Sequence, residues 1–208
     1  MSQTQAQLVK GLSITSASAD VITVDSTGNV GINKTSPVKD LDVTGEIRSS
    51  TGILFGTDTA AANTLDDYEE GTWTPNLTAV TPGTGSFAPA AANGGFYTKI
   101  GKRVFFQFNL NGTWTVGTAS GNAVINGLPF TNAASSDRPG SSAYSIVAVP
   151  WNDGFDFASG FTCTGCLVVP GTSELRVYAQ SNTASVTIPI SDAASTLNFH
   201  GGGSYEVP

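Results

Sequence analysis

The sequence predicts an all-β protein: a short extended or β-shaft region at the N-terminal end, followed by an antiparallel β-sandwich of jelly-roll type. Short apolar segments recur roughly every 8–12 residues with turn residues between them, which is typical of sandwiches and barrels. Glycine makes up 24 of the 208 residues, and glycine favours turns and disfavours helices. No long segment shows the apolar periodicity of a helix.

The chain is expected to divide into two regions, residues 1–63 and residues 64–208. The first contains a single aromatic residue, Phe55, whereas the second contains every Trp and Tyr. A segment with so few large apolar side chains cannot bury a core of its own. We therefore expect residues 1–63 to attach and trimerise, covered by sister chains in a homotrimer, with a dimer as the alternative. Residues 64–208 would fold as the β-sandwich.

Short strands are predicted in the first region at residues 21–24, 30–32 and 41–43. Between the first two lies a turn in which Gly28 and Asn29 suit a positive φ. Isolated strands of this length would expose unpaired edges, whereas strands wound around sister chains would be paired. The residues expected to make the trimer or attachment contacts are Val21, Val24, Val30, Ile32, Leu41, Val43 and Ile47.

In the second region, the segment 104–110 alternates apolar and polar side chains, as a half-buried strand does. Val104, Phe106, Phe108 and Leu110 would face the core. Asn111 and Gly112 then predict a tight hairpin. Further strands are predicted at residues 145–149, 166–169, 174–179 and 185–190.

Composition and charge narrow the function classes. Charged residues make up 12% of the chain, against about 25% in typical proteins, and the net charge is −7. The densest basic site is only Lys99, Lys102 and Arg103, so we expect no nucleic-acid partner. No segment approaches the ~20 apolar residues of a membrane span. Residues 1–12 lack the apolar stretch of a signal peptide, so we expect assembly in a cytoplasm and no membrane insertion.

A short motif of the first region consists of three segments: GNVGI at 28–32, TSP at 35–37 and LDVTGEIR at 41–48. This element resembles a shaft element that recurs in bacteriophage tail fibres. It departs from that pattern at Asn33, where the family usually carries Gly.

Four segments of the second region, in the same order, resemble a β-domain of fibre proteins from marine and cyanobacterial phages. They are LDDYEEGTWTP at 65–75, FYTKIGKRV at 96–104, INGLPF at 125–130, with Asn126 in place of the usual Ser, and the ending at 199–205. The resemblance implies a non-enzymatic virion protein: a trimeric tail fibre or receptor-binding appendage that contacts a host surface glycan or protein. The alternative is a capsid decoration (cement) or head-fibre protein that stabilises the phage head. Either would be found in the virion, bound to its own copies and to other virion proteins.

Candidate chemical groups are few, and we predict no catalytic residue, metal or cofactor. The acidic run Asp66, Asp67, Glu69 and Glu70 is interpreted as a solvated linker, with cation binding left open. Cys163 and Cys166 have the CxxC spacing, but one pair and one His do not make a zinc site. They are interpreted as buried or half-buried thiols, and His200 as a structural or exposed side chain, because no GxSxG nucleophile elbow accompanies it.

Several aromatic residues lie in or beside loop-like segments: Trp114, Tyr144, Trp151, Phe155 and Phe157. Each could fill the core, which is the favoured interpretation, or contact a sugar or protein partner. Because Asn and Asp flank the aromatics at residues 151–155, the predicted surface-contact loop is Trp151, Asn152, Asp153 and Phe155.

Overall fold

The computed structural model describes residues 22–57, 59–60, 64–137, 144–156, 163–181 and 184–208. Strands account for 56% of the structure, and the helical elements of the described residues are 3-10 turns such as η2 (Ser135–Asp137) and η3 (Ile190–Asp192). The all-β prediction is confirmed. Nothing in the described ranges is a helix long and apolar enough to cross a membrane.

The chain divides into two compact units, Met1–Thr51 and Gly52–Pro208. This division lies earlier than the expected boundary after residue 63. A two-residue bridge explains the difference: Ile53 and Leu65 exchange backbone hydrogen bonds of 2.9 and 2.8 Å. The segment that begins at Gly52 therefore belongs to the second unit.

The first unit contains three short strands in one sheet: β1 (Ile22–Val24), β2 (Val30–Ile32) and β3 (Leu41–Val43). β1 pairs with β2 antiparallel, and β2 pairs with β3 parallel. These strands are the ones that the sequence predicts, except that Val21 lies outside the described residues.

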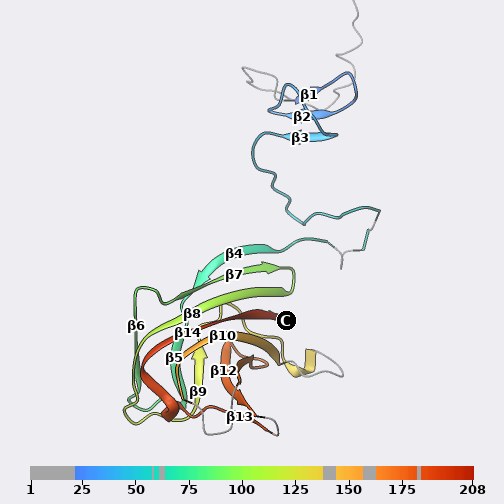
Figure 1. The fold of residues 1–208 in the computed structure, drawn as a ribbon. Coiled ribbons are helices and arrows are strands. Elements are labelled where there is room, and N and C mark those ends of the chain that lie inside the picture. The colour runs from blue at the N-terminus through green and yellow to red at the C-terminus, as the bar shows by residue number, and fades with distance from the viewer. Residues whose placement is uncertain (1–21, 58, 61–63, 138–143, 157–162, 182–183) are drawn as a thin grey trace, which may run out of the picture. The chain divides into compact units, whose positions relative to one another are not determined.

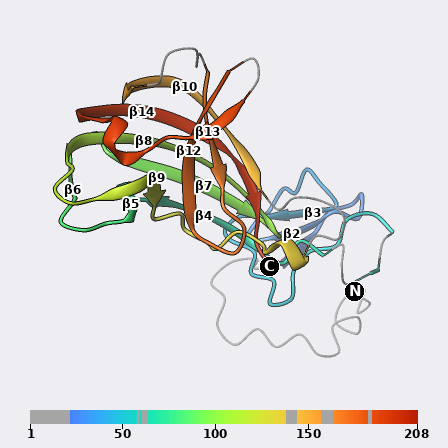
Figure 2. The ribbon, with the colours of Figure 1, turned by 90° about the horizontal axis from the view of Figure 1, so that it is seen from below.

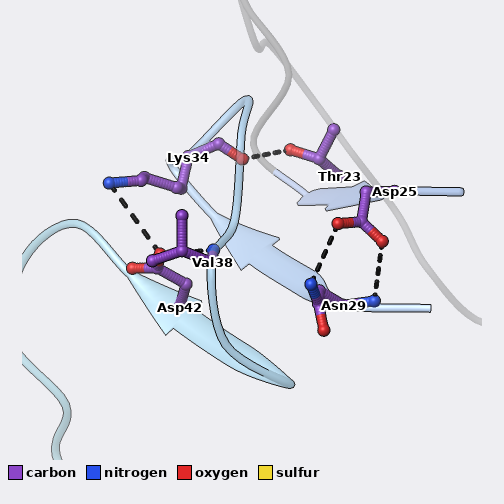
Figure 3. A network of polar contacts seen from close by, with 6 residues as sticks. All are labelled: Thr23, Asp25, Asn29, Lys34, Val38 and Asp42. Atoms are coloured by element: carbon purple, nitrogen blue, oxygen red, sulfur yellow. Dashed lines mark hydrogen bonds and ion pairs between the residues drawn. The ribbon is translucent and has the colours of Figure 1, made fainter. Parts of the chain in front are cut away.

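Side-chain carboxylates hold the turns of the first unit (Figure 3). Asp25 Oδ1 accepts hydrogen bonds from the backbone N–H groups of Thr27 (2.8 Å) and Asn29 (2.9 Å). Hydrogen bonds from the Thr27 hydroxyl, ahead of those from Asn29, lower the pKa of Asp25. Asp42 Oδ2 accepts from the backbone N–H of Val38 at 3.0 Å and lies 3.8 Å from Lys34 Nζ. Each carboxylate thus fixes the conformation of a turn through local hydrogen bonds to the backbone.

Backbone conformation in these turns differs in part from the expectation. Gly28 has φ of 92°, as predicted, but the described non-glycine residue with a positive φ is Asn33 (52°) rather than Asn29. Asn adopts this left-handed conformation more readily than other non-glycine residues do.

Little of the first unit is buried. Among its described residues only Gly31 and Pro37 are buried, while Val24 is 65% exposed and Leu41 and Ile47 are also exposed. The sheet of the first unit is therefore held by hydrogen bonds and contributes no hydrophobic core.

The second unit contains one sheet of eleven antiparallel strands in the order β4-β7-β8-β14-β10-β11-β12-β9-β5, with β6 on β8 and β13 on β12. Figures 1 and 2 show β4, β7, β8 and β14 side by side in this order. Since β5 at one end of the order also contacts β6 and β8, the sheet curls over itself into two layers with the core between them. The strands are β4 (Tyr68–Trp73), β5 (Asn76–Thr81), β6 (Ser86–Pro89), β7 (Gly94–Ile100), β8 (Arg103–Thr115), β9 (Ser120–Asn126), β10 (Ser145–Phe155), β11 (Cys163–Val168), β12 (Glu174–Gln180), β13 (Ser185–Thr187) and β14 (Ala193–Glu206).

The core is formed by alternate residues of the long strands. On β8 the core residues include Val104, Phe106, Phe108 and Leu110, all buried. The predicted inward face of this strand is therefore confirmed. The hairpin predicted at Asn111 and Gly112 is wrong, because β8 continues to Thr115.

Gly112 lies inside strand β8, where it allows neighbouring strands to pack closely, and not in a turn. It pairs with Leu197 of β14 on one side and with Pro89 of β6 on the other. A Cβ there would lie 2.7 Å from the Phe87 ring and 2.4 Å from the Ala88 carbonyl oxygen. Glycine is therefore needed for the close approach of β6.

Tyr205 connects the loop after β9 to the core through hydrogen bonds and ring packing. Its ring is buried against Phe106, 5.6 Å between centroids. Its hydroxyl donates to the Phe130 carbonyl oxygen (3.0 Å) and accepts from the Phe130 N–H (3.2 Å). Burial raises the pKa of Tyr205 to about 12.

We expect Tyr205→Phe to lower the free energy of unfolding by about 1–3 kcal/mol, since two backbone groups lose their partner. Wild-type stability should also fall between about pH 10, where an unfolded tyrosine titrates, and the folded pKa. The proton is bound more tightly in the folded state, so raising the pH through this window favours unfolding. Urea denaturation of both proteins at about pH 8 and about pH 11 measures the difference. If the free energy of unfolding falls equally in the two proteins between these pH values, the titration of Tyr205 is not the cause.

Candidate functional site

The outer face of the sheet, opposite the core, carries two neighbouring rows of paired residues. Directly paired residues on antiparallel strands point to the same face. One row joins Phe96 of β7, Gln107 of β8, Gly202 of β14 and Ala148 of β10. The other row joins Gly94, Asn109, His200 and Trp151 of the same four strands in turn.

Where the two rows meet, the surface is hollowed into a groove of about 830 Å³. Its floor is low because Gly94 and Gly202 have no side chains. A Cβ at Gly94 would meet no atom within 4 Å, whereas one at Gly202 would lie 2.9 Å from the Phe106 carbonyl oxygen. Gly94 therefore leaves open space, and Gly202 also allows β8 and β14 to approach. The turn at residues 91–93 lines one side of the groove, and Pro150 also lines it.

Amide and imidazole side chains supply the chemistry of the groove floor. Asn109 Nδ2 donates to the Ala92 carbonyl oxygen at 3.0 Å, while Asn109 Oδ1 is buried and has no hydrogen-bond partner among the described residues. His200 Nε2 lies 2.7 Å from Asn198 Oδ1. The part of the chain that the structure describes places no Asp, Glu, Lys or Arg in the lining.

Exposed apolar side chains flank the floor. Phe96 lines the groove and is 62% exposed. Trp151, 57% exposed, stands beside it as the partner of His200. Aromatic side chains with one free face can stack on a ligand.

The predicted contact loop at residues 151–155 is the last part of strand β10. Trp151 and Asp153 are exposed, and the Asn152 side chain bonds the backbone of Phe155 (3.1 and 3.2 Å). Phe155 is only 4% exposed and packs against Phe199. The expectation that Phe155 makes a surface contact is wrong, because the pairing of β10 with β14 shifts register between Asp153 and Phe155, and Phe155 beyond this irregularity points into the core.

The remaining aromatic residues of the same prediction differ from one another. Trp114 is buried in the core and Tyr144 is exposed. Phe157 lies outside the described residues.

The second half of the acidic run, Glu69 and Glu70, is part of strand β4 and not of a linker, whereas Asp66 and Asp67 precede the strand. Asp66, Glu69 and Glu70 are exposed to solvent, as expected. Glu69 accepts a hydrogen bond from the Tyr97 hydroxyl, and Glu70 accepts one from Tyr68. These bonds raise the pKa of both phenols. Because strand residues alternate, Glu69 and Glu70 face opposite sides of the sheet and cannot share a cation. Within the described ranges no group of His, Cys, Asp and Glu could hold a metal.

Asp67 pairs with Lys99, a buried lysine of β7. The ammonium group of Lys99 also lies 5.7 Å from the centre of the Phe130 ring. The Lys99 side chain is 9% exposed and that of Asp67 is 47% exposed. The buried ammonium group therefore needs its counter-ion more than the solvated carboxylate does.

We expect Asp67→Asn to destabilise the second unit more than Lys99→Met does, by about 1–2 kcal/mol. The first change leaves a buried cation without its counter-ion, whereas the second replaces it with an apolar chain of similar length. Urea denaturation of the two variants tests this. A larger loss in Lys99→Met would show that the ion pair itself stabilises the fold.

The cysteine pair is part of β11. Cys166 is buried, as expected, and burial raises the pKa of its thiol, which keeps it from reacting as a thiolate. The side chain of Cys163 lies outside the described residues.

The sequence interpretation missed most of the groove. It assigned no binding role to His200, Gln107 or Asn109, and it did not single out Gly94. One signal was present, the polar alternation on β8. Gly94 and Gly202 lie in strands for which the sequence analysis gave no bounds, although glycines within strands often mark a close approach of a ligand or another backbone.

Comparison with known proteins adds one informative result. No family model matches the chain, and no curated protein matches its sequence. Among solved structures, the Dettilon tailspike protein matches 67% of this chain with a TM-score of 0.50 and 18% sequence identity. At that identity the likeness concerns the fold alone. The chain covers 24% of the length of that tailspike protein.

Proposed function

We propose that this chain is a non-enzymatic structural protein of a bacteriophage particle, a trimeric tail appendage that contacts the host surface. The observation that carries the proposal is the likeness of the fold, over 67% of the chain, to a tailspike protein, in a chain whose two regions also resemble phage fibre elements. The first unit would attach and trimerise, and the second would form the distal knob.

Exposed apolar residues support self-association. In the first unit Val24, Leu41 and Ile47 are exposed, while Val30, Ile32 and Val43 are half-buried. Burying exposed apolar surface is favourable by about 25 cal/mol per Å². Three copies winding around one another would bury these side chains and pair the strand edges.

A capsid decoration or head-fibre protein is the second candidate. The two candidates share fold and oligomeric state and differ in position on the particle.

A non-enzymatic role is supported by the state of the reactive groups that the sequence offers. Glu69, Glu70 and Asp67 are engaged by hydroxyl or ammonium groups. The Cys166 thiol is buried, and His200 contacts an amide oxygen instead of a carboxylate.

We expect the purified chain to be a trimer in native mass spectrometry. Leu41→Ser with Ile47→Ser should shift it toward monomer, with at least about tenfold weaker association, because each change removes an apolar contact of ~1 kcal/mol or more. Val38→Ser is the matched control, since Val38 is 73% exposed in the same unit and lies outside the predicted contact set. A stable wild-type monomer at micromolar concentration would defeat the proposed trimer.

On the particle, gold labelling of the chain and quantitation of its copies should place it at the tail, in small copy number. Hundreds of copies on the head would instead establish the decoration role. Absence of the chain from purified particles would overturn both.

A further inference from the structure

We propose that the groove over β7, β8, β14 and β10 binds a neutral saccharide chain, with Phe96 and Trp151 as stacking platforms and Gln107, Asn109 and His200 as hydrogen-bonding groups. This inference rests on the proposed function and names the ligand class of its host-contacting unit.

Charge selects the class of ligand. The described lining contains no Asp, Glu, Lys or Arg, so neither a phosphate nor a carboxylate would find a lysine or arginine counter-ion in the groove. Asp153 is exposed on β10 two residues after Trp151, and the whole chain carries a net charge of −7. An anionic ligand would be repelled, and a cationic one would meet no carboxylate in the groove. A neutral ligand is favoured.

The polar groups suit hydroxyls. Amide and imidazole side chains can both donate and accept hydrogen bonds, as a sugar hydroxyl can. Gln107, Asn109 and His200 point to the same face from the adjacent strands β8 and β14. Asn109 Oδ1, unpartnered among the described residues, is an acceptor that a small shift of the amide would offer to a ligand hydroxyl.

The aromatic groups suit the apolar faces of sugar rings. Phe96 and Trp151 stand on β7 and β10, the outer strands of the four, so roughly 14 Å of sheet lies between them at ~4.8 Å per strand. The glycine positions keep the floor between them low. The surface from Phe96 across the groove to Trp151 beside it is therefore long enough for a short oligosaccharide that stacks at both ends.

A second copy of the chain is the competing occupant of this face. The other part of the same face exposes Phe105 and Ile146, which is 80% exposed. Neither residue lines the groove, so the two parts can be tested separately.

The test measures binding of the full chain to neutral polysaccharides (dextran, mannan, galactan and a β-glucan) and acidic ones (alginate and hyaluronate) by affinity electrophoresis. Gly94→Phe fills the groove without a steric clash, since its Cβ would point into open space. Trp151→Ala removes one platform. Phe105→Ala is the matched control: an exposed aromatic of the same face, outside the groove lining. Native mass spectrometry of each variant runs in parallel.

We expect retention by at least one neutral polysaccharide and none by the acidic ones. Gly94→Phe and Trp151→Ala should weaken retention at least about tenfold, while Phe105→Ala should leave it unchanged. Binding to acidic polysaccharides alone, retention that Gly94→Phe does not reduce, or no retention at all overturns the inference. Loss of the oligomer in Gly94→Phe would assign the groove to a second copy instead. The proposed function stands or falls separately, on whether labelled chains are found in the particle.

Discussion

The antiparallel pairing of β8 with β14 determines how the second unit is organised. It continues from Thr113 opposite Thr196 to Arg103 opposite Glu206, and the Arg103–Glu206 ion pair (2.6 Å) closes its end. Because paired residues share a face, this one register decides which side chains of both strands enter the core and which form the groove floor. A slip of one residue would exchange the two faces.

The two units are stabilised by different physical means. The first relies on local hydrogen bonds, such as the one that Asp25 accepts from the backbone N–H of Asn29 (Figure 3). Hydrogen bonds of this kind specify a turn but contribute little net stability in water. The second relies on a contiguous aromatic and aliphatic core, so it has the larger reserve of hydrophobic stabilisation. A protein that presents a stable domain on a segment completed by assembly would combine the two in this way.

Small residues shape the candidate site as much as large ones do. Gly94 and Gly202 leave the floor low, and Phe96 and Trp151 stand at its flanks. The same outer face thereby offers apolar contact area together with the amide and imidazole groups of Asn109 and His200. That combination suits a ligand with apolar faces and hydroxyl edges better than it suits a purely apolar partner.

The sequence by itself determined the fold class, the three short strands of the first unit and the inward face of β8, because these follow from alternation and turn residues in adjacent positions. Tertiary structure decided the rest. Gly112 reads as a hairpin residue but allows β6 to pack, and Phe155 reads as a loop residue but fills the core, since both depend on strands distant in the sequence. The groove and its flank join Gly94, Asn109, His200 and Trp151 across four strands. Only the long-range register, which local pattern does not encode, brings these residues together.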